Sequence, residues 1–182
     1  MPEAIRTLRP FIRENADNAA VQFYYGNLLL QQGDLGDAKS RFEKALELSP
    51  QFTDAIIGLS EVALAQRDWQ QAAIQLSKLN KEDLPELIWQ HLMLRIAFAN
   101  ALHAIEEGER NHWTETAKAH LEQFKAAQYK TPNPSTLDIE LFTALEHCLN
   151  NDKNSFNSTI TQLKNKYPDS HDLINQFVEI AD

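Results

Sequence analysis

The feature that most constrains this chain is a sequence pattern that returns every 34 residues. In the segment GDLGDAKSRFEKALELSP, Ala38 is followed by Phe42, Ala45 and Pro50, at offsets of 4, 7 and 12. A shift of 34 residues places small or apolar residues at the same offsets, namely Ala72, Leu76, Leu79 and Leu84. Offsets of 4 and 7 put side chains on one face of a helix. The pattern therefore predicts pairs of helices that recur along the chain.

Small residues and turn residues indicate how each helix pair would be built. Small residues stand where two helices would cross, so that their backbones can approach closely: Gly26, Ser60 and Ala144 on first helices, Ala38 and Ala72 on second helices. Two turns within pairs end in an aspartate that can cap the next helix, Asp34 and Asp68, and Asp152 matches Asp34 in the register near the C-terminus. Pro50 cannot continue a helix interior and marks the end of one repeat.

A small residue followed by Ala-x3-Phe-x2-Ala-x4-Pro at a 34-residue period resembles the tetratricopeptide repeat. The resemblance implies an all-α, right-handed α-α superhelix of about ten antiparallel helices. One repeat domain, residues 1–182, would contain a half repeat at 1–18, repeats at 19–52 and 53–86, an extended repeat at 87–132, a degenerate repeat at 137–170 and a capping helix at 171–181. The usual aromatic residue near the start of a repeat is replaced by Gln22 and Ile56.

The stretch 87–132 does not keep the period. Ala117 lies 45 residues after Ala72, which is 11 more than the repeat allows. We expect a first helix from Pro85 to about Glu107, lengthened by about three turns.

The start of the chain resembles the second half of a helix pair. A helix from Glu3 to Glu14 would lack its partner, so the chain is expected to be a piece of a longer protein. Ile5, Leu8 and Phe11 would then be partly uncovered or used in self-association. No signal-peptide core opens the chain. This favours the cytoplasm slightly, although a fragment leaves the compartment open.

The charge balance argues against two classes of partner. The chain carries 17 Lys and Arg against 26 Asp and Glu, a net charge of −9, and both halves are acidic. An acidic chain disfavours a surface that follows the phosphates of a nucleic acid, or an anionic membrane surface. No apolar stretch near a terminus is long enough for direct membrane insertion.

Catalytic signatures are absent from the sequence, which has no Gly-rich phosphate loop, HExxH, CxxC or GxSxG motif. We therefore predict no enzyme, no cofactor and no metal. His112 and His120, with Glu115 between them, could hold a metal, but a solvated helix face is the preferred interpretation. Neighbouring His147 and Cys148 would point about 100° apart on a helix, so they do not form a nucleophile pair.

Trp69 and Trp113 fall at the start of second helices, where packing is the preferred interpretation over a ligand-stacking site. The repeat register does not decide between these two roles for Trp89.

The family resemblance also implies a binding surface. First helices of such arrays line a concave groove that usually binds a peptide or helix of a partner protein. The register assigns six residues of the best-matching repeats to this groove: Phe23, Asn27, Leu30, Asp54, Ile57 and Glu61. Asn27 matches one asparagine of the clamp with which chaperone adaptors hold a carboxylate. Phe23 and Gly58 stand where that clamp has lysine and its other asparagine, so a clamp is not supported.

The expected groove mixes apolar and acidic side chains, which favours an amphipathic or basic partner segment. A competing interpretation is that the protein's own long helix fills part of this surface. The sequence thus predicts a protein–protein interaction scaffold or adaptor. The alternative is a regulatory or substrate-presenting domain of a larger enzyme. Upstream sequence would distinguish the two.

Overall fold

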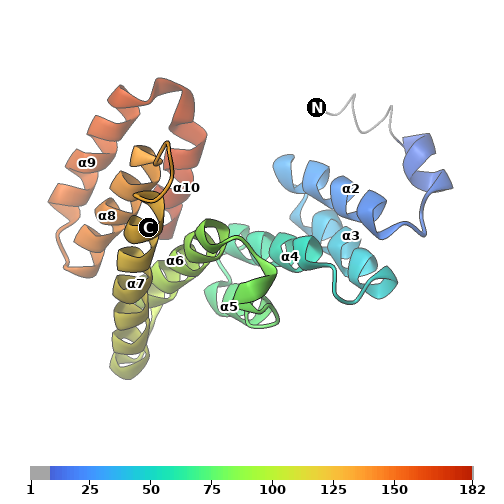
Figure 1. Cartoon of the computed structure of the whole chain (residues 1–182), viewed down its shortest axis with the longest axis horizontal. Coiled ribbons are helices and arrows are strands. Elements are labelled where there is room, and N and C mark those ends of the chain that lie inside the picture. The colour runs from blue at the N-terminus through green and yellow to red at the C-terminus, as the bar shows by residue number, and fades with distance from the viewer. Residues whose placement is uncertain (1–8, 182) are drawn as a thin grey trace. The chain divides into compact units, whose positions relative to one another are not determined.

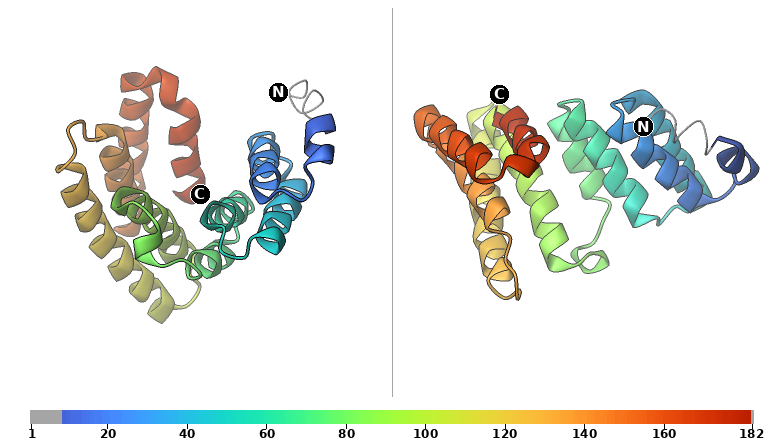
Figure 2. Two further views of the ribbon diagram at one scale, coloured as in Figure 1. Left: turned by 45° about the vertical axis from the view of Figure 1, so that its right-hand side comes forward. Right: turned by 90° about the horizontal axis from the view of Figure 1, so that it is seen from above.

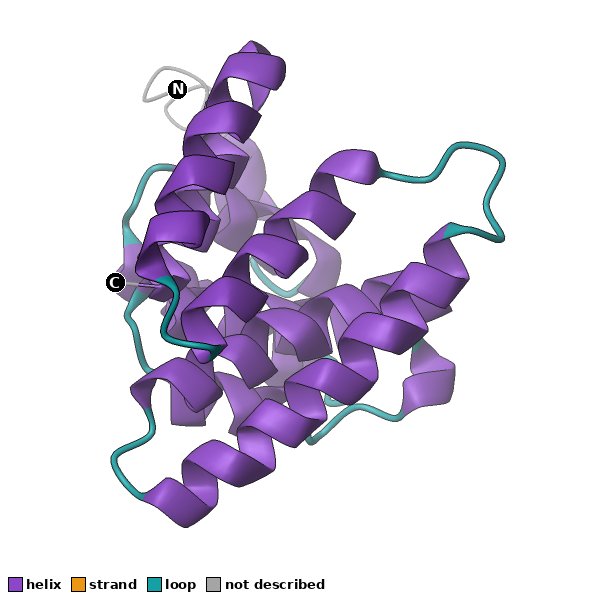
Figure 3. Ribbon diagram, turned by 90° about the vertical axis from the view of Figure 1, so that its left-hand side faces the viewer, coloured by secondary structure: helices purple, strands orange, loops and turns teal. Residues whose placement is uncertain are grey.

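The computed structural model describes residues 9–181, and within this range the regular structure is helical with no strand (Figure 3). The prediction of an all-α fold is confirmed. Contacts divide the chain into two compact units, Met1–Asp83 and Leu84–Asp182, called here the N-terminal and the C-terminal unit. Each is described by itself.

The N-terminal unit contains a helical segment at residues 9–14 followed by two helix pairs (Figure 1). The expected helix from Glu3 therefore lies partly outside the described residues, as do Ala4, Ile5 and Leu8, while Phe11 is 54% exposed. The pairs are α2 (Ala19–Gln31) with α3 (Leu35–Leu48), and α4 (Thr53–Ala65) with α5 (Trp69–Leu76). A short 3-10 helix, Lys81–Asp83, ends the unit. Pro50 lies in the connection between α3 and α4, where it interrupts no helix.

Phe42 on α3 is the centre of the N-terminal core and is fully buried. A Cβ atom added to Gly26 on α2 would lie 2.7 Å from the Phe42 ring, and one added to Gly58 on α4 would lie 2.6 Å from it. Two glycines from neighbouring helices thus make room for one large ring. Gly26 was expected to allow a close approach, whereas the register had matched Gly58 only to an asparagine of the carboxylate clamp. The structure shows that Gly58 packs onto Phe42.

Ser60, the position that the 34-residue period matches to Gly26, is also fully buried. Its hydroxyl group donates to the backbone carbonyl of Ala72 on α5, at 3.4 Å. Ala38 and Ala72 are themselves inaccessible to solvent. Small residues therefore sit where the two helices of each pair meet.

The turns of three helix pairs share one unusual backbone conformation. Gly33, Arg67 and Asn151 each follow the C-cap residue of a first helix and have φ values of 82°, 59° and 57°. The left-handed conformation lets the chain leave a helix and satisfy its last carbonyl groups. These positions correspond in the repeat register, so the turn geometry repeats even where the residue type does not.

Of the three aspartates at this position of the register, two cap the following helix. The carboxylate of Asp68 accepts from the Gln71 amide and that of Asp152 from the Ser155 amide, both at 3.0 Å. Asp34 makes no side-chain capping bond, so that prediction is wrong. Its backbone (φ −78°, ψ 65°) is close to that of Asp68 (φ −93°, ψ 76°), so the difference lies in the side chain.

The C-terminal unit contains α6 (Glu86–His103), α7 (Glu107–Gln128), α8 (Thr136–Leu149), α9 (Lys153–Lys166) and α10 (His171–Ala181), with a 3-10 helix at Pro168–Ser170 (Figure 2). The expected first helix running to about Glu107 is wrong in its end point, because α6 stops at His103. The extra length is shared: α6 has 18 residues and α7 has 22, against 13 in α2 and 14 in α3.

The break between α6 and α7 has a local cause. Glu107 and Glu109 lie in the first turn of α7, where the helix dipole favours negative charge. Arg110 donates through Nη2 to the carbonyl oxygen of Ala104, the C-cap residue of α6, at 2.9 Å. The end of α6 and the start of α7 are thus both stabilised in the short connection between them.

Phe142 on α8 is the centre of the C-terminal core and is fully buried. Its ring centroid lies 4.9 Å from that of Phe177, 5.2 Å from those of Phe124 and His91, and 6.2 Å from that of Phe98. These rings come from α10, α7 and α6. The last helix was expected to cap the end of the stack, but Phe177 shows that α10 contributes to the middle of this core.

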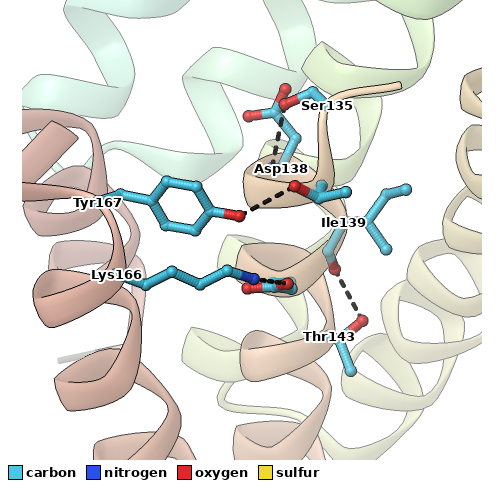
Figure 4. A network of polar contacts seen from close by, with 8 residues as sticks. Ser135, Asp138, Ile139, Thr143, Lys166 and Tyr167 are labelled. Carbon is cyan, nitrogen blue, oxygen red and sulfur yellow. Dashed lines mark hydrogen bonds and ion pairs between the residues drawn. The ribbon is translucent and has the colours of Figure 1, made fainter. Parts of the chain in front are cut away.

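Polar contacts fasten α9 to α8 on the surface of the unit (Figure 4). Lys166 forms an ion pair with Glu140 at 2.7 Å, and the hydroxyl groups of Tyr167 and Thr136 are 2.9 Å apart. The hydrogen bond and charge of Glu140 raise the pKa of Lys166 above its ordinary value.

Candidate protein-interaction site

The six residues expected to bind a partner all lie in the N-terminal unit, on α2 and α4, which pack against each other. Phe23, Asn27 and Leu30 are four and three residues apart and share one face of α2. On α4, the spacing of three and four gives a second row: Asp54, Ile57 and Glu61. We call these six residues the α2–α4 surface.

The α2–α4 surface remains accessible to solvent. Asp54 is exposed and the other five side chains are half-buried. Half-buried apolar side chains can bury more area when a partner binds, and that burial favours association. The arrangement is suited to a contact with an apolar segment.

Phe23 has a structural role in addition to any binding role. Its ring centroid lies 5.4 Å from that of Phe52, 6.0 Å from that of Phe42 and 5.2 Å from that of Tyr24. Leu30 also packs against the core around Phe42. Phe23→Ala would therefore remove part of the core packing in addition to any contact with a partner.

Asp54 also has a local explanation. It lies in the first turn of α4, where a carboxylate stabilises the helix dipole. Asp37 likewise lies in the first turn of its helix, α3, and is also exposed. The two aspartates therefore form a matched pair, one on the α2–α4 surface and one away from it.

Sequence reasoning missed a cleft of about 1000 Å³ elsewhere in the N-terminal unit. It is lined by side chains of the segment before α2, of α2 and of α3: Arg9, Pro10, Ile12, Arg13, Glu14, Ala16, Gln22, Tyr25 and Arg41. Three of these are arginines. The acidic charge of the chain as a whole concealed this local concentration of positive charge.

The histidines considered as metal ligands are arranged differently from the expectation. His120 is half-buried, and its Nδ1 lies 2.6 Å from Oε1 of the buried Gln90, whose Nε2 donates to Gln123 at 2.7 Å. The interpretation of a solvated face is therefore wrong for His120, although it fits the exposed His112. Within residues 9–181, no three or more His, Cys, Asp or Glu side chains are grouped to hold a metal.

Other candidates have packing roles. The thiol of Cys148 is buried, and His147 is half-buried. Trp69, Trp89 and Trp113 are half-buried rather than fully enclosed. Across the described part of the chain, no helix combines the length and apolar character needed to cross a membrane.

Comparison with known families agrees with the helix-pair architecture. Two family models described as tetratricopeptide repeat match the chain, one at residues 2–50 and the other at residues 29–96. Together they cover the α2–α4 surface. No curated protein and no solved structure matches the chain. Tetratricopeptide repeats generally mediate protein–protein interaction and are typically non-catalytic scaffolds. The repeat spacing, the recurring turn and these matches together show that the chain is a tetratricopeptide repeat protein.

Proposed function

We propose that this protein is a scaffold or adaptor that binds an amphipathic or basic segment of a partner protein along the α2–α4 surface. It acts by binding rather than by catalysis. The observation that carries the proposal is the pairing of half-buried apolar side chains with accessible carboxylates on two adjacent helices.

The two kinds of side chain would contribute differently. Burial of Leu30 and Ile57 under a partner supplies most of the binding free energy, because apolar area removed from water dominates association. Asp54, which is exposed, attracts a positively charged segment and acts mainly on the association rate at low salt. A helix or peptide with a leucine-rich face and lysines beside it has the required chemistry.

A peptide-binding experiment tests the charge requirement. The probe is a fluorescein-labelled synthetic peptide of leucine and lysine, patterned as an amphipathic helix, and fluorescence anisotropy measures its affinity. Asp54→Lys is expected to weaken binding severalfold at low salt and less at high salt, since exposed charges are screened. Asp37→Lys is the control, because it makes the same charge change in the first turn of a different helix. Equal effects of the two variants would reject the α2–α4 surface.

Site-specific crosslinking tests the location directly. A photoreactive amino acid replaces Asn27 or Ile57 on the α2–α4 surface, or Ser40 on the exposed side of α3 as a control. Crosslinks to the probe peptide are expected from the first two positions and not from the third. Crosslinking from Ser40 alone would place the contact on the other side of the helix pair.

A further inference from the structure

The arginine cleft, lined by the residues named above, is a concave feature of the N-terminal unit that the proposed function does not use. It lies between the helical segment at residues 9–14 and the α2–α3 pair, and its volume is about 1000 Å³. That volume is at the upper end of the range of sites that hold a ligand, about 300–1000 Å³.

Positive charge is concentrated in this cleft. Residues 1–84 contain nine Lys and Arg and twelve Asp and Glu. Three of those nine cations line the cleft, against one of the twelve carboxylates, Glu14. A chain with net charge −9 thus forms a locally cationic cavity.

Arg41 is held in place by neighbours in the cleft. Its Nη1 donates to Oε1 of Gln22 at 3.3 Å, and its guanidinium lies 4.9 Å from the centre of the Tyr25 ring. Gln22 is only 1% exposed and donates through Nε2 to the carbonyl oxygen of Ala16 at 2.7 Å, which fixes its amide. A guanidinium has five N–H donors, and the bond to Gln22 uses one of them.

Arg9 and Arg13 line the same cleft as Arg41, from the helical segment at residues 9–14. They are four residues apart on the helical segment and so share one face. Both are exposed, and neither side chain forms a hydrogen bond or ion pair with another residue in the range 9–181. These two arginines therefore have no carboxylate partner within the described residues. Together with Arg41, which is held in position, they provide donors that suit carboxylate groups.

We propose that this cleft is a second binding site, and that it takes an acidic segment of a partner protein. Guanidinium groups bind carboxylates through paired N–H donors. Pro10, Ile12 and the Tyr25 ring add an apolar wall on which a neighbouring side chain can pack. Positive charge does not continue over the otherwise acidic unit, so a protein segment fits better than a nucleic acid, whose phosphates extend along its length.

The arginine cleft is separate from the α2–α4 surface. Gln22 and Tyr25 lie on a different side of α2 from Asn27 and Leu30, given about 100° of rotation per residue. The two sites also have opposite charge. The protein would therefore hold an acidic segment and a basic one at the same time, which would let it bridge two partners.

Fluorescence anisotropy with a short fluorescein-labelled peptide of glutamate, leucine and phenylalanine tests the proposal on the full chain. The variant Arg9→Gln with Arg13→Gln is expected to weaken binding about tenfold or more, since hydrogen bonds to charged groups contribute at that level. Neither side chain has a partner to lose within the described residues, so the melting temperature is expected to stay unchanged. Lys39→Gln with Arg67→Gln removes the same charge from exposed positions outside the cleft and serves as the matched control.

The proposal is overturned if the peptide does not bind the unaltered protein, or if the control variant weakens binding as much as the cleft variant. It is also overturned if a single-stranded oligothymidine binds more tightly than the peptide and displaces it, because the site would then recognise phosphates. Asp54→Lys is expected to leave binding of the acidic peptide intact or slightly stronger. A failure of the α2–α4 surface is therefore distinguishable from a failure of the cleft.

Discussion

The two units differ in how they surround the large aromatic ring at the centre of each core. In the N-terminal unit, Phe42 fits against Gly26 and Gly58, and the glycines let the α2 and α4 backbones come close to the ring. In the C-terminal unit, Phe142 is surrounded by other rings, including Phe177 at 4.9 Å and Phe124 at 5.2 Å. In the N-terminal core two helix backbones approach the central ring, whereas in the C-terminal core other aromatic side chains surround it.

This difference explains why one unit keeps the 34-residue period more closely than the other. A ring pressed against two backbones allows only a small residue at each contact, and this restricts the residue types at positions 26 and 58. A cluster of rings from four helices can be filled in several ways, and helices of different length can contribute to it. The long α6 and α7 of the C-terminal unit are compatible with such a core.

The largest expected effect comes from truncating the centre of the aromatic cluster. Phe142→Ala is expected to lower the free energy of unfolding by about 3–5 kcal/mol, because it removes a fully buried ring and leaves a cavity. Urea unfolding followed by circular dichroism measures the change. Tyr129→Ala, at a side chain that is 72% exposed, is the control and is expected to cost little. Similar costs for the two variants would mean that the ring cluster is not packed as described.

The glycine contacts of the N-terminal unit are tested next. Gly58→Ala places a Cβ atom 2.6 Å from the Phe42 ring, and overpacking of this kind costs about 1–3 kcal/mol. Phe42→Leu should reduce that cost in the double variant, because the smaller side chain leaves room for the methyl group. Thermal unfolding of the two single variants and the double variant measures the coupling.

Gly36→Ala is the control for that cycle, since a Cβ atom there meets nothing within 4 Å. It is expected to be neutral or slightly stabilising, as alanine is the better helix former. Additive effects of Gly58→Ala and Phe42→Leu would show that the two residues do not share a tight contact.

Substitutions in the shared turn are expected to change the stability less, and with opposite signs in two repeats. Arg67 has a φ of 59°, which is unfavourable for a residue with a side chain, so Arg67→Gly is expected to stabilise the protein by up to about 1 kcal/mol. Gly33→Arg, at a φ of 82°, is expected to destabilise it by about 1 kcal/mol. Melting temperatures measure both changes. If both substitutions shift stability in the same direction, the two turns are not equivalent.

The smallest effect concerns the helix caps and depends on pH. The hydrogen bonds from Ser155 hold the pKa of Asp152 below its ordinary value of 3.8. A lowered pKa in the folded state means that the ionised carboxylate stabilises the fold above pH 3.8, and that this contribution is lost as the pH falls through the folded-state pKa. Asp152→Ala is therefore expected to destabilise the protein at neutral pH and to match the unaltered protein in strong acid.

Asp34→Ala provides the contrast for this measurement, because Asp34 makes no side-chain capping bond. Its effect should be smaller than that of Asp152→Ala at neutral pH. Urea unfolding at several pH values follows both variants. A constant difference between Asp152→Ala and the unaltered protein down to strong acid would contradict the ionised cap.

Several parts of the structure were predictable from local patterns alone. Offsets of 4 and 7 indicated the helices, and the turn before Trp69 indicated a cap at Asp68 that the structure contains. The failure at Asp34 shows the limit of this reasoning, because a capping residue type does not determine its rotamer. The positions of the six residues of the α2–α4 surface on two adjacent helices also followed from the register, whereas their role in binding stays a prediction.

The sequence by itself determined the all-α class and the family, because helix periodicity and a fixed repeat are properties of neighbouring residues. Only the tertiary structure decided which side chains share a space. It placed Gly58 against Phe42, brought Phe177 from the last helix to Phe142, and put Arg41 in one cleft with Arg9 and Arg13. These contacts join residues far apart in the chain, and they depend on how helices approach one another in three dimensions, which no local spacing specifies.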